Sequence, residues 1–331
     1  MSKILIFGTG GVGCIYSYVL EKGGAKVTAV CRSNYTAVKE QGITIDSKLW
    51  GKVHSSPTPV RTVTEAATHG PFDYILVCSK AFPGTSALIK DAVTPAVTSI
   101  ILAQNGIGIE EEYHTAYPEN TIISGVLYLP TTQTSPGYVS MGPLELFQIG
   151  VYPTPSTPPT PSQQSSIEAT ETFASLFTKG GATCTIHADV QKPRWIKLSA
   201  NAAWNSMCAL THCDDANLLR SSPGAMQQIR KIMKEVAVLA DGVGYPGTIT
   251  DAEIDKILER MALRLDTGGR EPSMLTDVRH SRPMETEAIL GNAVRIAARH
   301  GIEVQGLDLL YVLLRGKGYS MNPDETWRDI A

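Results

Sequence analysis

Several features that would mark particular protein classes are missing from this sequence. It has no run of eighteen apolar residues and no Cys-x-x-Cys or paired Cys/His spacing, so neither a membrane-spanning helix, a zinc site nor a disulfide framework is predicted. Its net charge of -3 offers no basic surface of the kind that binds nucleic acid. The apolar start at Ile4–Phe7 is too short for a secretory signal, and we expect a cytoplasmic protein with reduced cysteines.

The length and composition predict two domains. A chain of 331 residues with 43% hydrophobic and 18% charged residues has enough apolar material for two separate cores. Strand patterns fill the first half, and helical patterns fill the second. We therefore expect an α/β fold with a Rossmann-type doubly wound sheet over residues 1–166 and a mainly helical domain over residues 167–331. The Pro-, Ser- and Thr-rich stretch 153–166 is predicted to be a surface loop without regular structure.

A glycine-rich motif follows the first apolar run. Lys3–Phe7 is typical of a buried parallel strand, a helical pattern runs to about Leu20, and Lys26–Val30 is a second strand. In this context the glycines allow a tight turn and a close approach of the backbone to a pyrophosphate, while the helix N-terminus offers free N–H groups. The predicted dinucleotide-binding residues are Gly8, Thr9, Gly10, Gly11, Val12 and Gly13.

The end of the second strand favours NADP(H) over NAD(H). An NAD-binding chain usually has an acidic residue there for the ribose 2′-hydroxyl, whereas this one reads Cys31-Arg32-Ser33-Asn34. Arg32 is suited to pair with a 2′-phosphate, and Ser33 or Asn34 to donate a hydrogen bond to it. The alternative is that Arg32 is a loop arginine in solvent.

Two polar residues follow later strands of the expected sheet. Asp73–Cys78 ends at Ser79-Lys80, and the strand 99–103 is followed by Asn105. Ligands of open parallel sheets bind beyond the carboxyl ends of the strands, which makes Lys80 and Asn105 candidate contacts of a cofactor or substrate. A surface lysine and a simple Asn-Gly turn are the alternatives. Further strands are expected at 43–46, 52–54, 121–128, 137–140 and 144–149, the last three extending the sheet in a partly antiparallel manner.

The stretch Arg194–Leu210 predicts a buried helix with one polar stripe. Lys197, Asn201 and Asn205 recur at a spacing of four, which places them on one face of an otherwise apolar helix. A buried ammonium is costly, so the stripe favours a ligand-filled or water-accessible site in which the pKa of Lys197 is lowered. Alternatively, Lys197 extends to solvent and the asparagines bond to neighbouring backbone.

Helical patterns dominate the remainder of the chain. They cover 226–239, 251–264 and 284–300, with Gly301 as the C-cap of the last. Pro283 suits a first helical turn and places Glu285 near the positive end of the helix dipole. On its own, Glu285 would be interpreted as a residue that stabilises the start of this helix.

Taken together, these motifs resemble the ketopantoate reductase (2-dehydropantoate 2-reductase) family over essentially the whole chain. The resemblance implies a Rossmann domain, a helical C-terminal domain and an NADPH-dependent reduction in the cleft between them. The motifs that carry it are Gly8–Gly13, Val77–Lys80, Gln104–Gly108, Trp195–Leu198 with Asn201 and Asn205, and Ser273–Asp277 with Glu285.

The resemblance also implies roles for individual residues. Lys197 is similar to the family's catalytic lysine and Glu285 to its active-site glutamate, which also lies on the cofactor side. Lys80 matches a cofactor-side lysine. Hydride addition builds negative charge on a carbonyl oxygen, and a lysine aimed at that oxygen can stabilise the charge and donate a proton. The residues that match contacts of the substrate or the nicotinamide ribose are Asn105, Asn201, Asn205 and Ser273.

The substrate is the least determined part of this interpretation. The segment Arg270–Pro272 departs from the small polar sequence typical of the family, and pocket residues decide which carbonyl compound is reduced. The leading hypothesis is reduction of 2-dehydropantoate to pantoate. The alternatives are a reductase of the same fold acting on another ketoacid or a secondary-metabolite ketone, and a non-catalytic NADP-binding sensor. The oligomeric state stays open, a homodimer included.

Overall fold

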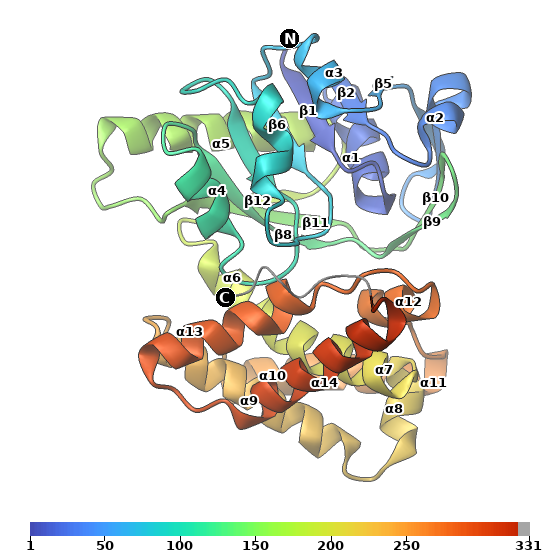
Figure 1. Cartoon of the computed structure of the whole chain (residues 1–331), viewed down its shortest axis with the longest axis vertical. Coiled ribbons are helices and arrows are strands. Elements are labelled where there is room, and N and C mark those ends of the chain that lie inside the picture. Colours follow the sequence, from blue (N-terminus) through green and yellow to red (C-terminus); the bar gives the residue numbers. More distant parts are fainter. Residues whose placement is uncertain (324–331) are drawn as a thin grey trace. The chain divides into compact units, whose positions relative to one another are not determined.

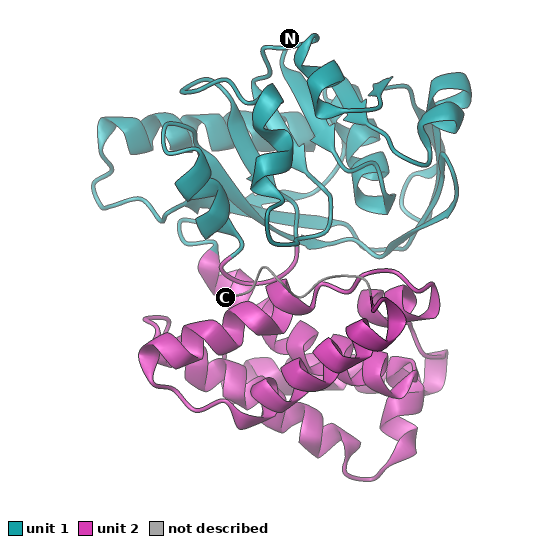
Figure 2. Ribbon diagram, in the orientation of Figure 1, with its two compact units in different colours: residues 1–104, 109–190 teal, residues 105–108, 191–331 magenta. Residues whose placement is uncertain are grey.

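The computed structural model describes residues 1–323, which form two compact units (Figure 2). Unit 1 contains residues 1–104 and 109–190, and unit 2 contains residues 105–108 together with the chain from 191 onward. The sequence placed the domain boundary after Ser166, which lies inside a helix of unit 1. The contacts within the chain divide it after Val190 instead, because the helix and the strand that follow Ser166 both pack on the sheet of unit 1.

Unit 1 is built on a mostly parallel eight-stranded sheet with the strand order β12-β11-β8-β7-β6-β1-β2-β5 (Figure 1). The chain winds from β1 outward through β2 to β5 and then returns to β6 on the other side of β1. β11 is antiparallel to β8, as predicted for this end of the sheet. The strands are β1 (Lys3–Phe7), β2 (Lys26–Val30), β5 (Thr58–Val60), β6 (Tyr74–Val77), β7 (Ser99–Leu102), β8 (Ile122–Tyr128), β11 (Leu146–Tyr152) and β12 (Cys184–Ile186).

The first helix of unit 1 lies between the large sheet and a small one. α1 (Gly11–Lys22) contacts β1, β2 and α5 and also every strand of the small sheet, whose order is β4-β3-β10-β9. The small sheet consists of β3 (Ile43–Ser47), β4 (Gly51–Ser55), β9 (Thr131–Ser135) and β10 (Tyr138–Met141). The remaining helices are α2 (Tyr35–Gln41), α3 (Val63–Ala67), the 3₁₀ helix η1 (Ser86–Ala92), α4 (Glu110–Ala116) and α5 (Pro161–Lys179).

Two details of unit 1 correct the sequence-based prediction. The strand expected at 137–140 does not extend the large sheet, because β10 pairs with β3 and β9. The Pro-rich stretch is irregular only as far as Thr160. Pro161 opens α5, since proline fits a first helical turn, and Thr160 and Gln163 form a reciprocal capping box.

Unit 2 is helical over its described residues and packs around α9 (Ala225–Gly242). Its core is one apolar cluster that includes Trp204, Met233, Leu275 and Leu307, together with Ile107 from the short segment 105–108. The helices are α6 (Gln191–Ala200), η2 (Asn201–Asn205), α7 (Ser206–Thr211), α8 (Asp215–Ser221), α9, α10 (Asp251–Ala262), α11 (Arg264–Thr267), α12 (Ser273–Arg279), η3 (Glu287–Gly291), α13 (Asn292–His300) and α14 (Gln305–Met321).

The helix predicted at Arg194–Leu210 is present, but it is not α-helical throughout. α6 and α7 are joined by η2, a π-helical turn. A second π turn, η3, precedes α13, which ends at Gly301 with a φ of 65° as expected for a glycine C-cap. Helical backbone starts at Thr286 there, so Pro283 lies ahead of the helix rather than in its first turn.

Some features bear on function through what the described residues do not contain. No helix among residues 1–323 is long and apolar enough to span a membrane. The same residues contain no cluster of three or more His, Cys, Asp or Glu side chains arranged to hold a metal ion. All six cysteines are free thiols.

Candidate functional site

The glycine loop of unit 1 joins β1 to α1 in a tight turn. Gly8 has a φ of +100°, and a Cβ atom there would lie 2.5 Å from the backbone nitrogen of Ser79. A Cβ on Gly13 would lie 2.1 Å from the carbonyl oxygen of Gly8, so this glycine lets α1 pack directly on the loop. A Cβ on Gly10 would meet no atom within 4 Å. Two glycines are therefore required by the fold, and Gly10 leaves open space where a ligand can approach.

The loop is held from the end of β2. The Thr9 hydroxyl donates to the carbonyl of Val30 at 2.5 Å, and the Asn34 amide donates to the carbonyl of Thr9 at 2.7 Å. Asn34 is only 4% exposed. The sequence suggested Asn34 as a donor to a cofactor phosphate. In the structure its amide nitrogen fixes the backbone of the glycine loop, and its contact with a phosphate stays a prediction.

A pocket opens beside this loop, entirely within unit 1. Arg32 and Ser33 are exposed at its edge, as the sequence predicted. The hydroxyl of Ser79 is buried and has no hydrogen-bond partner. Gln133 of β9 also lines the pocket, which sequence reasoning missed because only tertiary structure brings the small sheet there. The lining residues are Phe7, Gly8, Thr9, Gly10, Val30, Arg32, Ser33, Asn34, Ser79 and Gln133.

Lys80 follows Ser79 at the end of β6 and is partly buried. It is not among the residues that line the pocket. β1 and β6 are adjacent strands at the point where the winding of the sheet reverses, which is where open α/β sheets bind their ligands. The position of Lys80 thus agrees with the sequence, and its contact with a ligand stays a prediction.

A second polar site lies in unit 2 and is formed by three side chains, which we call the Lys197 triad: Lys197, Asn105 and Glu285. The Lys197 ammonium donates to Oδ1 of Asn105 at 2.9 Å. The amide nitrogen of Asn105 faces Oε2 of Glu285 at 3.4 Å. The amide of Asn105 therefore connects a cation and a carboxylate that are far apart in the sequence.

The environment of Lys197 lowers the pKa of its ammonium group to about 7. Burial is the main cause, because it disfavours the charged form, and the nearby charge of Arg194 acts in the same direction. The negative charge of Glu285 opposes both and raises the pKa. A lysine whose pKa is near 7 is partly protonated at neutral pH and also releases its proton readily, which suits proton transfer.

The π turn η2 keeps the polar stripe together. Four residues advance an α-helix by about 40° more than one full turn. A π turn is wider, so the same step falls short of a full turn and cancels most of that drift. Asn201 and Asn205 bracket η2, and Oδ1 of the buried Asn205 has no hydrogen-bond partner. Buried polar atoms are normally hydrogen-bonded, so an unpaired oxygen is consistent with a residue that binds a ligand.

Ser273 is exposed and is the first residue of α12, after Pro272. Lys197, Asn105 and Glu285 were each candidates from the sequence, but the hydrogen bonds that link them were not predicted.

Two further residues hold the segment that carries Asn105, and neither was predicted from the sequence. Arg194, 2% exposed, donates to the carbonyl of Gly106 at 2.9 Å. The amide of Asn292 donates to the carbonyl of Ile107 at 2.7 Å. Such pairings depend on tertiary packing over 88 and 185 residues of sequence and have no local pattern.

Comparison with known proteins covers both units. The family model described as "Ketopantoate reductase PanE/ApbA" matches residues 4–153, and the model described as "Ketopantoate reductase PanE/ApbA C terminal" matches residues 189–318. An uncharacterized protein of Saccharomyces cerevisiae is 28% identical, with the alignment covering 95% of this chain and 93% of that protein.

Solved structures agree with this. The crystal structure of 2-dehydropantoate 2-reductase from Methylococcus capsulatus is 31% identical, with a TM-score of 0.82 over 97% of this chain and 98% of that one. A D-mandelate dehydrogenase solved with NADH and anilino(oxo)acetate has the same fold, with a TM-score of 0.82 at 20% identity over 97% of this chain and 99% of that one.

Proposed function

This chain belongs to the ketopantoate reductase family, and on that premise we propose that it reduces a 2-oxo acid with NADPH, most directly 2-dehydropantoate to pantoate. The protein is an oxidoreductase that acts on CH–OH groups. The observation that carries the proposal is the Lys197 triad, in which a lysine of pKa about 7 donates to an amide that also faces a carboxylate.

The residues of unit 1 fit a dinucleotide phosphate. The first turn of α1 has no acidic residue and no side-chain cap, so its N–H groups are available to a pyrophosphate, and Gly10 leaves room for one. The buried hydroxyl of Ser79 supplies a hydrogen-bonding group that lacks a protein partner. We assign the 2′-phosphate to Arg32 with Ser33, because both are exposed at the pocket edge and no acidic residue lines it. Lys80 is assigned to the cofactor as well.

Lys197 supplies the proton in this reaction. NADPH, when bound, supplies the hydride that the carbonyl carbon accepts. The carbonyl oxygen then takes a proton from the Lys197 ammonium, which leaves a neutral amine. Before the transfer, the same ammonium polarises the carbonyl and stabilises the negative charge that develops on its oxygen. Glu285 favours the ammonium form, so the acid is present near neutral pH.

The neutral polar residues of unit 2 are assigned to orientation. Asn201, Asn205 and Ser273 offer amides and a hydroxyl to the carboxylate or hydroxyl groups of a substrate without adding charge beside Lys197. Asn105 and Glu285 are also assigned to the nicotinamide ribose. The unpaired Oδ1 of Asn205 is the best support among these, since it lacks any partner within the described chain.

The substrate is tested with a panel of 2-oxo acids and the two reduced cofactors. The rate of NADPH or NADH oxidation by the purified protein is measured with 2-dehydropantoate, other branched 2-oxo acids and aromatic 2-oxo acids. We expect turnover with NADPH and the highest kcat/KM for 2-dehydropantoate. A higher kcat/KM for another ketoacid or ketone would change the proposed substrate but not the proposed reaction.

If the protein binds NADPH but turns over no carbonyl compound, the hypothesis of an enzyme would be replaced by that of a non-catalytic sensor. Against that alternative, a sensor needs the glycine loop and Arg32 but not the Lys197 triad. The cytoplasmic location and a homodimer remain predictions from the sequence.

A further inference from the structure

The short segment 105–108 is attached to unit 2 at several points. Its Ile107 side chain is 2% exposed in the apolar core of that unit, and the Ile107 N–H donates to the carbonyl of Ala288 at 3.0 Å. A Cβ atom on Gly106 would lie 2.4 Å from that same carbonyl oxygen. These contacts hold the segment in place, and the remaining question is what sets the exact position of Asn105.

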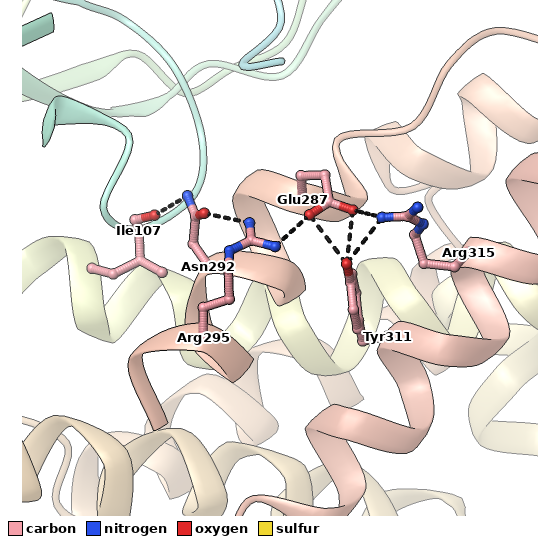
Figure 3. Close-up of polar contacts among 6 residues, drawn as sticks. All are labelled: Ile107, Glu287, Asn292, Arg295, Tyr311 and Arg315. Atoms are coloured by element: carbon pink, nitrogen blue, oxygen red, sulfur yellow. Dashed lines mark hydrogen bonds and ion pairs between the residues drawn. The ribbon is translucent and has the colours of Figure 1, made fainter. Parts of the chain in front are cut away.

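Asn292 is the polar group that holds the far end of this segment. Its amide nitrogen donates to the carbonyl of Ile107 at 2.7 Å (Figure 3). Its amide oxygen accepts from Nη2 of Arg295 at 2.7 Å. Because a guanidinium only donates, this contact decides which end of the amide is the oxygen, and the nitrogen is left to face Ile107.

A chain of charged contacts fixes Arg295 in turn. Its Nη1 donates to Oε2 of Glu287 at 2.8 Å, and Glu287 also accepts from the hydroxyl of Tyr311 at 3.0 Å and pairs with Arg315 (Figure 3). The Glu287 side chain is only 13% exposed. The Arg295 side chain is 41% exposed, but its two hydrogen bonds, to Glu287 and to Asn292, fix its orientation. The chain runs from α14 through η3 and α13 to the segment that carries Asn105.

We propose that Asn292 is a positioning residue for the reaction proposed above: by holding the Ile107 carbonyl it keeps Oδ1 of Asn105 against the ammonium of Lys197, and Arg295 and Glu287 hold Asn292. The inference rests on the proposed function. It assigns no contact with substrate or cofactor to Asn292, which acts two residues away through the backbone of the segment.

The expected signature is a change in the acid, not only in stability. A hydrogen bond accepted from the ammonium favours the charged form, so a looser Asn105 lowers the pKa of Lys197 further. Less ammonium is then present at pH 7, and the rate of reduction falls. A role confined to folding would lower the melting temperature and leave this pKa unchanged.

The test replaces Asn292 by leucine, which has a similar size and no hydrogen-bonding group. For Asn292→Leu we expect kcat at pH 7 to fall about tenfold, with little change in the KM for NADPH. About twofold of this comes from the smaller fraction of ammonium, and the remainder from the looser position of Asn105. The pKa of Lys197 should be about 0.5 lower, because one acceptor is loosened and not removed. That pKa is measured without turnover. The intact enzyme is acetylated at a series of pH values and then digested, and the extent of acetylation of Lys197 is determined by mass spectrometry.

Asn120→Leu is the matched control. The amide of Asn120 also bridges to backbone carbonyls, those of Thr94 and Thr98 at 2.9 and 2.8 Å, but in unit 1. We expect it to lower the melting temperature and to leave the pKa of Lys197 unchanged. An unchanged pKa of Lys197 in Asn292→Leu, or the same change in both variants, would overturn the proposal.

If Asn292→Leu does not fold, Arg295→Met tests the same chain one step away. It frees the Asn292 amide to turn, and we expect the same lowering of the Lys197 pKa to a smaller extent; no change would overturn the proposal. The acetylation measurement also separates the two hypotheses. Absence of turnover in the unmodified enzyme contradicts the proposed function, whereas an unaltered pKa in the variants contradicts only the role of Asn292.

Discussion

The two sites of this protein are built in opposite ways. The pocket of unit 1 is lined mainly by short runs of residues at the ends of β1, β2 and β6, with three of them in the glycine loop. The Lys197 triad is made of side chains from three separate stretches, and burial alters the chemistry of one of them. In the proposed function, the pocket of unit 1 holds the phosphates of the cofactor and the side chains of the triad take part in the reaction. We therefore expect substitutions in unit 1 to alter binding or folding and substitutions in the triad to alter rate.

The sharpest test of this contrast is Lys197→Ala. Loss of a general acid typically costs about 10²- to 10⁴-fold in rate, so we expect kcat to fall by that factor. The dissociation constant of NADPH, measured by fluorescence titration, should stay the same because the phosphates are assigned to unit 1. Lys192→Ala, an exposed lysine of the same helix α6, is the control and should keep full activity. Near-normal turnover of Lys197→Ala would remove this residue as the acid.

The next test compares two glycines of one loop. Gly13→Ala should lower the free energy of unfolding by about 3 kcal/mol, because its Cβ would clash with a backbone carbonyl that has little room to move. Gly10→Ala has open space and a φ of -81°, so we expect an unchanged melting temperature and weaker NADPH binding. Thermal unfolding with and without NADPH measures both. Equal stability of the two variants would contradict the close packing of Gly13 against the carbonyl of Gly8.

The smallest expected effect concerns the choice of cofactor. Arg32→Asp should raise the KM for NADPH about tenfold, the value of one charge-assisted hydrogen bond, and leave that for NADH unchanged or lower. Arg61→Asp is a matched control, since Arg61 stacks on the ring of Tyr35 at 4.0 Å and does not line the pocket. If both variants lose NADPH preference equally, the effect comes from net charge and not from a contact of Arg32.

The same contrast explains how much the sequence foretold. The glycine loop, the position of Arg32 and the strands β1 and β2 follow from local patterns, because turns and buried strands restrict residue types over a few positions. Lys197, Asn105 and Glu285 were found as candidates through the resemblance to a family and through one helical stripe.

The interactions that the sequence did not foretell are long-range ones. The hydrogen bond from Asn34 to Thr9 was not anticipated, and Gln133, Arg194 and Asn292 showed no signal at all. An asparagine that bonds a backbone carbonyl looks like any other asparagine until the fold brings the two together. The start of α5 was misjudged for a different reason. Proline was interpreted as a helix breaker, although at Pro161 it is the first residue of a helix.

The attachment of residues 105–108 to unit 2 also affects how the chain acquires its structure. Ile107 belongs to the core of unit 2, whose other buried residues begin at Trp195. The ribosome therefore adds Ile107 to the chain long before the rest of that core. During synthesis, the helices of unit 2 can complete their core only by packing around this earlier side chain. A fragment starting at residue 191 would lack this side chain and have a gap in its core, which costs several kcal/mol in comparable cases. The core of unit 2 therefore requires a segment that the chain supplies between two parts of unit 1.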